Sequence, residues 1–452
     1  MKAYFKILTL SLLAVILFLP PAFSQKIAIT DVHVIPMDRE ILLENQTVLI
    51  SNGKIESISN SADFQNNGNY QIIEGKGKYL IPGLSEFHSH IPNNMELAEE
   101  TMWLYVMHGV LTVRGMIGHP NHLVLKEKIA NGELVGPRIF AAGPSLNGTS
   151  VENPEKGRQM VKDQAAANYD HLKLHPGLDK PKFDAIAETA QNEDIFYGGH
   201  VSVDVGLVHA LAGGYRSIEH MDGYIEALVS DKSLLDPQVS GLFGVNLIEH
   251  IDRNKMDELV KMTKAQKTWI VPTQSLFERW MGPASAQEFE QMEEFKLMAV
   301  GTRANWFRQK RMFDNSQPNK EKLEDYLAFR REMLMMLHDA GVPFVLGSDS
   351  PQILNVPGVA THHEMAALAR AGMSPFEIYK TGTVNAAEYF EQKETFGQIT
   401  VGADADLVLL NANPLEAVEN FQTIEGAIVQ GKFITKETLN QKKMEIIEAN
   451  KE

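Results

Sequence analysis

Short apolar runs alternate with amphipathic stretches along most of the chain, from about residue 84 onward. The apolar runs have the length of buried strands, and the stretches between them have the periodicity of surface helices. Eight strands are predicted, over residues 84–90, 109–116, 137–146, 171–176, 195–201, 215–221, 269–276 and 343–350. Helices are expected between them, for example over residues 96–107, 154–167, 183–191 and 321–338. This repetition predicts an α/β fold, a closed (β/α)8 TIM-like barrel with its helices outside.

The two ends of the chain have a different pattern, with short strands and turn signals. Strand-like segments lie at residues 27–36, 47–51 and 54–58, and Asn52-Gly53 is a hairpin turn signal. Similar segments return at residues 397–402, 405–410, 424–429 and 431–435. We predict a small β-sandwich domain composed of residues 25–83 and 393–435, a barrel domain over residues 84–392, and a charged, solvated helical tail over residues 436–452.

Residues 277–320 form a long insertion after the seventh predicted strand, rich in Trp, Phe, Met and Arg. A segment of this length in a compact fold is usually functional or disordered. Two interpretations stay open: an extra helical hairpin packed on the barrel, or a lid over its mouth.

Residues 1–24 have the pattern of a secretory signal peptide. Lys2 and Lys6 precede an apolar run at residues 7–19, and Ala22 and Ser24 are the small residues of a cleavage site. The apolar run is short for a membrane span. We therefore expect an exported protein, periplasmic or secreted, with no stable membrane span after cleavage.

Composition narrows the partners and the chemistry. The formal net charge of −16 disfavours nucleic acid as a partner, because phosphate binding needs a basic surface. The chain has no cysteine, which excludes disulfides, thiolate metal sites and thiol nucleophiles. A small-molecule substrate is the expected partner, and a homo-oligomer stays open.

Candidate chemistry gathers at the ends of the predicted strands, where the active sites of such barrels lie. His88 and His90 are two residues apart in one strand, so their side chains share a face, and a pair of imidazoles suits a metal. Lys173 stands between two leucines inside a strand, where a salt-bridged lysine is the ordinary explanation. The candidate metal ligands are His88, His90, Lys173, His200, His220 and Asp349.

Other polar residues near these strand ends are weaker candidates for a role in the site. Arg114 and Tyr224 lie at or just past barrel strands and are candidates for holding a substrate carboxylate. His175 faces the same side as Lys173 and is expected in the substrate pocket rather than as a ligand. Glu219 is adjacent to His220, so strand alternation predicts that it points into the helix layer.

These residues stand in motifs that resemble the amidohydrolase superfamily, in its imidazolonepropionase-related or Xaa-Pro-dipeptidase-like subgroup. The resemblance covers nearly all of the chain after the signal segment. The matching pieces are IPGL at 81–84, HSH at 88–90, GPRI at 136–139, HLKL at 171–174, His200, IEH at 218–220, GSD at 347–349 and VGADADLV at 401–408.

The resemblance implies a distorted barrel with two divalent metal ions, expected to be zinc. Carried over by position, His88, His90 and Asp349 would bind the more buried metal, and His200 and His220 the other. Lys173 would bridge both after its Nζ takes up carbon dioxide to form a carbamate. Asp349 is the expected general base and acid, taking a proton from a metal-activated water and passing it to the leaving nitrogen.

Two positions depart from the pattern of the superfamily. Glu86 stands where an aspartate usually precedes the first histidine, and Gly115 follows Arg114 where an aspartate is common. Neither change removes a ligand, but both leave the hydrogen bonds around the ligands open.

The expected function is an exported metal-dependent hydrolase of an amide or peptide-like C–N bond, in a dipeptide or an N-acyl amino acid. A lactone, ester or phosphotriester hydrolase on the same two metals is the alternative. A mononuclear deaminase fits less well, because that class lacks the bridging lysine and carries a glutamate where Val203 stands. A catalytically inactive binding protein is a further alternative, since a fold does not fix a function.

Overall fold

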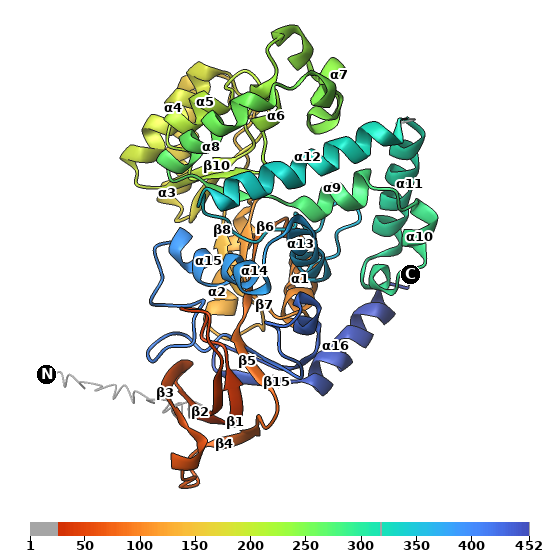
Figure 1. Cartoon of the computed structure of the whole chain (residues 1–452). Helices are drawn as coiled ribbons and strands as arrows, with labels where there is room; N and C mark the ends of the chain where they lie inside the picture. Colours follow the sequence, from red (N-terminus) through yellow and green to blue (C-terminus); the bar gives the residue numbers. More distant parts are fainter. Residues whose placement is uncertain (1–25, 317–318, 452) are drawn as a thin grey trace, which may run out of the picture.

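The computed structural model describes residues 26–316 and 319–451, so the predicted signal segment lies outside the described residues. Two parallel sheets form the wall of a barrel (Figure 1). One sheet contains β6 (Leu84–Ser89), β7 (Val110–Gly115) and β8 (Arg138–Ala141). The other contains β9 (His171–Leu174), β10 (Phe196–Gly199), β11 (Ser217–Glu219) and β12 (Trp269–Val271).

The barrel closes at both seams between these sheets. Parallel bridges Ala142↔His171 and Leu146↔Leu174 join β8 to β9. Residues 343–350 join β12 to β6 through the parallel bridges Ile270↔Phe344 and Ser89↔Ser350. These residues were predicted as a regular eighth strand, but they contribute only scattered ladder bonds, such as Ser350 N to His88 O at 3.1 Å. The predicted α/β barrel is nevertheless confirmed.

Helices lie outside the barrel, and several of them begin at a residue whose side chain caps the first turn. The side chains of Asn94, Asn153 and Asp179 each accept a hydrogen bond from a first-turn N–H group. The helices that follow the barrel strands are α1 (Met95–Met107), α2 (Pro120–Ala130), α3 (Pro154–Ala166), α4 (Lys180–Asn192), α5 (Leu207–Ala212), α6 (Tyr224–Leu228), α7 (Pro237–Ser240), α8 (Met256–Ala265), α12 (Lys320–Asp339), α13 (Val359–Ala371), α14 (Pro375–Gly382) and α15 (Val384–Tyr389).

Strands from both ends of the chain pair in one sheet, which lies at the lower end of the molecule in Figure 1. Strand β13 of the C-terminal part pairs antiparallel with β5 of the N-terminal part. A bridge between Lys54 and Asp404 joins the β3 edge to the C-terminal part. Its strands are β1 (Ile27–Val34), β2 (Leu43–Ser51), β3 (Lys54–Asn60), β4 (Gln71–Glu74), β5 (Tyr79–Pro82), β13 (Leu407–Leu410), β14 (Ile424–Val429) and β15 (Lys432–Thr435).

The long insertion is helical. It begins within α9 (Gln274–Met281), which starts in the last residues predicted as the seventh strand, and continues through α10 (Ala286–Glu290), the 3₁₀ turn η5 (Glu293–Leu297) and α11 (Val300–Ser316). Phe295 packs edge-on against Trp306 and Phe307, with ring centroids 6.3 and 5.0 Å away. These buried aromatic side chains give the insertion an apolar core, as a packed helical hairpin requires. Its function as a lid stays a prediction.

The C-terminal helix α16 (Lys436–Ala449) packs against α1 and η5 and against the strands β14 and β15. Leu439 and Ile446 are buried, and the Asn450 amide donates to Glu100 Oε1 at 2.8 Å and to Leu297 O at 3.2 Å. The predicted charged helix is therefore present, but one of its faces is packed rather than solvated. The many charged residues of this segment favoured a solvated helix, because only a narrow stripe of apolar side chains, including Leu439 and Ile446, is buried.

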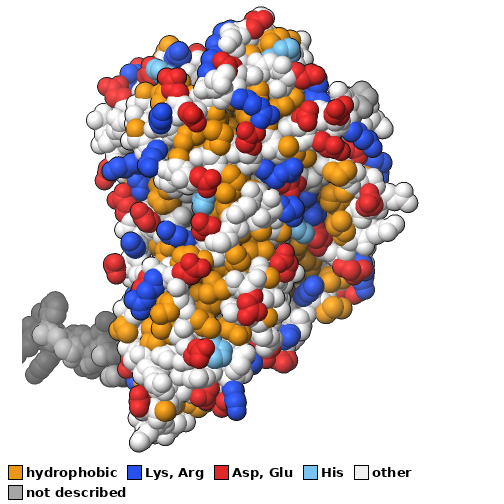
Figure 2. Space-filling model, viewed as in Figure 1, with side chains coloured by type: hydrophobic (Ala, Val, Ile, Leu, Met, Phe, Trp, Pro, Cys, Tyr) orange, Lys and Arg blue, Asp and Glu red, His pale blue; other side chains and the backbone are white. Residues whose placement is uncertain are grey.

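The surface carries charges of both signs. Acidic and basic side chains are interspersed over the face drawn in Figure 2. Among residues 26–316 and 319–451, no helix has the length and hydropathy needed to cross a membrane.

The packing of α16 leads to a stability prediction. Replacing Ile446 by Ala removes buried apolar volume and should lower the free energy of unfolding by about 2 kcal/mol. Met444→Ala is the matched control on the same helix, because Met444 is 62% exposed, and it should change stability by less than about 0.5 kcal/mol. Urea denaturation would measure both; equal effects would contradict the observed packing.

Candidate metal centre

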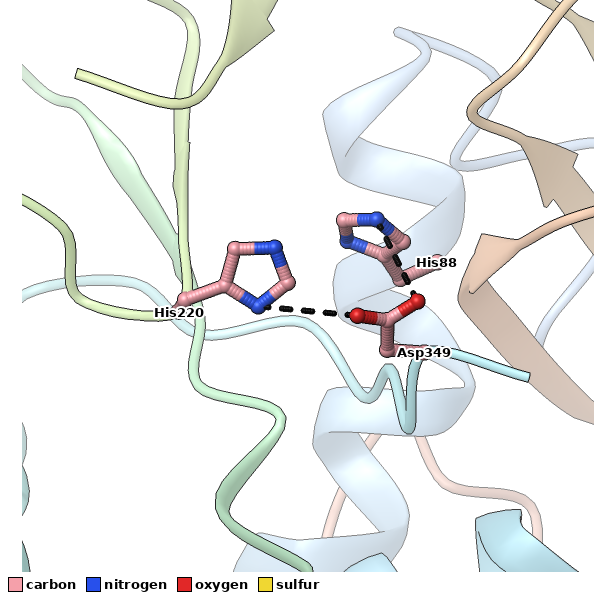
Figure 3. A group of neighbouring side chains, drawn as sticks. All are labelled: His88, His220 and Asp349. Atoms are coloured by element: carbon pink, nitrogen blue, oxygen red, sulfur yellow. Dashed lines mark ion pairs between the residues drawn. The ribbon is translucent and has the colours of Figure 1, made fainter. Parts of the chain in front are cut away.

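Histidine and aspartate side chains from separate strand ends converge at one end of the barrel. His90 Nε2 lies 3.2 Å and His88 Nε2 3.8 Å from Asp349 Oδ1, and His220 Nδ1 lies 3.9 Å from Asp349 Oδ2. Figure 3 shows His88 and His220 approaching the Asp349 carboxylate from two sides. The potential ligand atoms of these three buried residues all lie within 4.8 Å of one another. Such a group has the composition and spacing of a metal site.

Lys173 lies inside the same cluster and is fully buried. Its Nζ lies 3.3 Å from His88 Nε2. Space for its side chain depends on Gly199, whose φ of +138° already favours glycine. A Cβ at Gly199 would lie 2.9 Å from Lys173 Cδ and would also collide with the Leu174 carbonyl.

The remaining two predicted ligands are held by hydrogen bonds to Nδ1. His200 Nδ1 donates to Asp222 Oδ2 at 2.7 Å, and His220 Nδ1 is hydrogen-bonded to Thr273 Oγ1 at 2.8 Å. The ring centroids of His200 and His220 are 4.6 Å apart. Because Nδ1 is engaged in each ring, Nε2 is the nitrogen that would coordinate a metal.

The Glu219 carboxylate is hydrogen-bonded to the His88 ring, which corrects the prediction that Glu219 points into the helix layer. Glu219 Oε2 accepts a hydrogen bond from His88 Nδ1 at 2.9 Å, and its Oε1 accepts one from Arg114 at 2.7 Å. The prediction failed because His220 has a φ of 61°. This left-handed turn ends the strand and lets both neighbours face the barrel interior, whereas regular alternation would separate them.

Arg114 was predicted to hold a substrate carboxylate, but its guanidinium is engaged by acceptors of the protein itself. It is fully buried and also donates to Phe87 O, Ser217 Oγ and Tyr389 Oη. Its guanidinium therefore neutralises Glu219 within the barrel core. Sequence alone could not reveal this role, because the two residues are distant in the chain and meet only across the barrel.

Tyr224, the second residue predicted to hold a substrate carboxylate, is also engaged by the protein itself. Its side chain is fully buried, and its hydroxyl is hydrogen-bonded to Thr263 Oγ1 at 2.6 Å, so it packs α6 against α8. His175 does lie beside the site, with its ring centroid 5.4 Å from that of His200. Its Nδ1 is hydrogen-bonded to Ser145 Oγ at 2.7 Å. Its contact with substrate stays a prediction.

Glu86, the departure at the start of the motif, is fully hydrogen-bonded. Its carboxylate accepts bonds from Ser348 N and Oγ at 2.8 and 2.6 Å, from Thr361 Oγ1 at 2.9 Å and from His88 N at 2.9 Å. Burial raises the pKa of Glu86 to about 7, against the effect of these donors. Glu86 is longer than the aspartate usual at this position, and it still connects β6 to residues 343–350.

Gly115, the second departure from the pattern, lies against Ile91. A Cβ added at Gly115 would be 3.2 Å from Ile91 Cδ1.

The electrostatics of the cluster suit a divalent cation. Burial lowers the pKa of His88, His200 and His220 well below the usual value, so the rings are neutral and offer lone pairs. Asp349 Oδ1 is buried and has no hydrogen-bond donor among the described residues. Burial also lowers the pKa of Lys173 to about 8, although Glu219 and Asp349 oppose this shift. Neutral imidazoles and a buried carboxylate oxygen that accepts no hydrogen bond do not satisfy one another. A bound metal ion would use the lone pairs of both.

The residues that sequence reasoning missed are the partners of the rings, Glu219, Asp222 and Thr273. Asp222 follows His220 by two residues, and this proximity to a predicted ligand was the available signal. Thr273 carried no comparable signal, because its φ of 45° after β12 turns it toward His220.

The fold and the site together define a parallel α/β barrel with a histidine-rich metal centre at its strand ends. Residues 79–434 match the model of the Amidohydrolase family, so the chain belongs to this family. The resemblance predicted from sequence is confirmed at this level.

Curated relatives match shorter segments. Ochratoxinase from Aspergillus niger is 39% identical over 85 residues, covering 18% of this chain and 17% of that protein. Adenine deaminase from Ruegeria pomeroyi is 27% identical over 192 residues, covering 38% of this chain and 31% of that protein. The chain thus matches less than a third of the length of these relatives.

Solved structures share the fold over nearly the whole chain. A bottromycin amidohydrolase superposes with a TM-score of 0.74 at 20% identity, covering 94% of this chain and 91% of its own. An Xaa-Pro dipeptidase with bound methionine superposes with a TM-score of 0.67 at 17% identity, covering 91% of this chain and all (100%) of its own. Identities this low support the fold alone.

The space around Lys173 gives a first test. Gly199→Ala should displace the Lys173 side chain and reduce bound metal, because the added Cβ meets Lys173 Cδ and the Leu174 carbonyl. Gly301→Ala is the control, since no atom lies within 4 Å of a Cβ there. Elemental analysis after metal loading would compare them; unchanged metal content in Gly199→Ala would contradict the proposed crowding.

The Glu219 contacts give a second test. Glu219→Gln should weaken metal binding by about 10–100-fold, because His88 loses its anionic acceptor. It should also cost about 3–5 kcal/mol of stability, since the Arg114 charge stays buried without a partner.

The double variant Arg114→Met/Glu219→Gln separates the two effects. It should recover much of the lost stability without recovering metal affinity. Competition with a fluorescent chelator and urea denaturation would measure these quantities, and recovery of both together would mean that Glu219 acts only on folding.

Proposed function

We propose that this protein is an exported, metal-dependent hydrolase of an amide or peptide-like C–N bond. The single observation that carries the proposal is the convergence of four histidines, Lys173 and Asp349 at one end of the barrel. The substrate of the enzyme in this proposal is a dipeptide or an N-acyl amino acid. Export rests on the pattern of residues 1–24.

The residues divide into two sets of ligands for two divalent ions, for which zinc is our proposal. His88, His90 and Asp349 would hold one ion, and His200 and His220 would hold the other. Lys173 would lie between them as a carbamate. Its burial and its lowered pKa support this role, because only the neutral amine reacts with carbon dioxide.

The metal ions, when bound, would acidify a water molecule and polarise the substrate carbonyl. The protein's residues supply the remaining parts of the reaction. Asp349 would take a proton from the attacking water and return it to the leaving nitrogen. Burial raises the pKa of Asp349 to about 7, so its carboxylate is more basic than an exposed one.

Glu219 and Asp222 would keep His88 and His200 in the tautomer that presents Nε2. Glu219 is fully buried, and Arg114 compensates its charge within the barrel core. These carboxylates therefore have positioning roles rather than catalytic ones.

The names of two proteins with the same fold support an amide or peptide-like C–N bond as the bond that is hydrolysed. One structure of the same fold is called an amidohydrolase, and another an Xaa-Pro dipeptidase. A hydrolase of lactones, esters or phosphotriesters remains the second candidate, because the same arrangement of ligands serves those bonds.

A deaminase is the competing proposal that the adenine deaminase match raises. The burial of Lys173 in contact with His88 favours the two-metal hydrolase, because the mononuclear site implied by deaminases has no bridging lysine. A binding protein without activity is disfavoured because all six predicted ligand positions carry residues able to bind metal or form a carbamate.

Metal content tests the proposal. The purified protein, loaded with zinc and bicarbonate, should hold about two ions per chain, and Lys173→Ala should hold one or none. Lys310→Ala is the matched control, because Lys310 is also fully buried but binds Gly282 O and Asp314 in the insertion. Elemental mass spectrometry would count the ions.

Activity completes this experiment. Hydrolysis of dipeptides and N-acyl amino acids should disappear after chelation and return with the metal. One ion in both the wild type and Lys173→Ala would contradict the bridging role of Lys173. No ion in either would leave the binding protein as the better proposal.

A further inference from the structure

Phe243 lies beside the candidate metal centre, although no metal-binding motif includes it. Its ring centroid lies 5.6 Å from that of His220, at an angle of 57°. It belongs to the 3₁₀ segment η3 (Leu242–His250), in the long loop that follows β11 on the same side of the barrel as the ligands. Phe243 is only partly buried, whereas His220 behind it is 1% exposed. Part of Phe243 therefore stays accessible to solvent, next to a buried histidine.

The backbone of Phe243 is held in a conformation that a bulky residue rarely adopts. Its φ and ψ are 52° and 32°, and Gly244 continues the left-handed turn with a φ of 71°. Tyr326 Oη donates to Phe243 O at 2.8 Å and fixes this turn. Strained residues of this kind persist where the surroundings impose them, and they gather at functional sites.

The packing behind Phe243 fixes the direction of its ring. Phe277 meets it edge-on at 4.8 Å, and the Arg330 guanidinium lies 3.4 Å from the Phe277 ring. Arg330 also donates to His220 O at 2.9 Å. One stack of side chains thus supports both the metal-site histidine and the aromatic ring beside it.

The two sides of the site differ in polarity. On the side of His200, His175 is hydrogen-bonded to Ser145, whose Oγ also accepts from Asn147 at 3.1 Å. On the side of His220, the rings of Phe243 and Phe277 lie near the imidazole, and the one hydroxyl bonded to it, that of Thr273, is taken up by His220 Nδ1. The nearby Arg330 does not offer its charge to a ligand, because Nε, Nη1 and Nη2 all donate to protein oxygens.

We propose that Phe243 forms the apolar wall of the substrate site and selects substrates with an aryl or branched alkyl group next to the scissile carbonyl. The inference rests on the proposed metal-dependent hydrolysis and narrows its substrate class. A free carboxylate would occupy the polar side of the site, near His175. An apolar group against Phe243 would displace poorly bound water and pack on the ring face.

Hydroxamic acids that differ only in their acyl group test this proposal without turnover, because the hydroxamate group binds the metal itself. The probes are acetohydroxamic, benzohydroxamic, phenylacetohydroxamic and 3-phenylpropionohydroxamic acids. Calorimetry with the zinc-loaded full chain should show tighter binding of at least one aryl probe than of acetohydroxamate, by about tenfold or more.

Phe243→Ala should abolish most of this preference while leaving acetohydroxamate affinity and metal content unchanged. Phe243→Leu should retain part of it, because Leu keeps an apolar side chain. Leu242→Ala is the matched control, since Leu242 is adjacent in the same turn and 38% exposed. In turnover assays, Phe243→Ala should raise KM for aryl substrates more than it lowers kcat.

Four other outcomes would overturn the inference. If the aryl preference is absent, or survives in Phe243→Ala, Phe243 does not select substrate, although the metal centre and the proposed function stand. If Phe243→Ala weakens all probes equally, its role is only structural. If no hydroxamate binds the zinc-loaded wild type, the proposed function fails and the inference fails with it.

Discussion

Closure of the barrel by residues 343–350 is the constraint on which the site depends. This segment hydrogen-bonds to β12 through Ile270 and to the histidine strand through His88 O and His90 N. The Glu86 carboxylate reinforces the second contact by accepting from Ser348 N and Oγ. As a result, Asp349 leaves the barrel wall beside His90, with its carboxylate 3.2 Å from the imidazole. A looser closure would separate the carboxylate from the histidines that it meets.

The barrel interior beside the site contains a buried pair of opposite charges, Arg114 and Glu219. Arg114 from β7 reaches across to Glu219 on β11, and its guanidinium lies 4.9 Å from the Phe87 ring centroid and 5.0 Å from that of Tyr389. A buried charge without a partner would be costly. Here the same pair that neutralises the core also orients His88. Stability and the geometry of the candidate metal centre therefore depend on one network.

Helix α12, which follows the long insertion, supports the opposite side of the site. Its Arg330 donates to His220 O and Pro272 O, and its Tyr326 donates to Phe243 O. These bonds hold the residues that follow β11 and β12 against each other. The helix thus links the metal-site histidine to the aromatic ring proposed to contact substrate.

The sequence by itself determined the kind of fold and the residues able to bind metal, because strand and helix periodicity and residue chemistry are local properties. His88, His90, His200, His220 and Asp349 could be named from their places at predicted strand ends, and Lys173 from its place inside a strand. Only the tertiary structure decided which polar residues accompany them. Glu219 turned inward because His220 adopts a left-handed conformation, and Arg114 and Tyr224 proved to be buried. Such outcomes depend on contacts between distant segments, which no local pattern encodes.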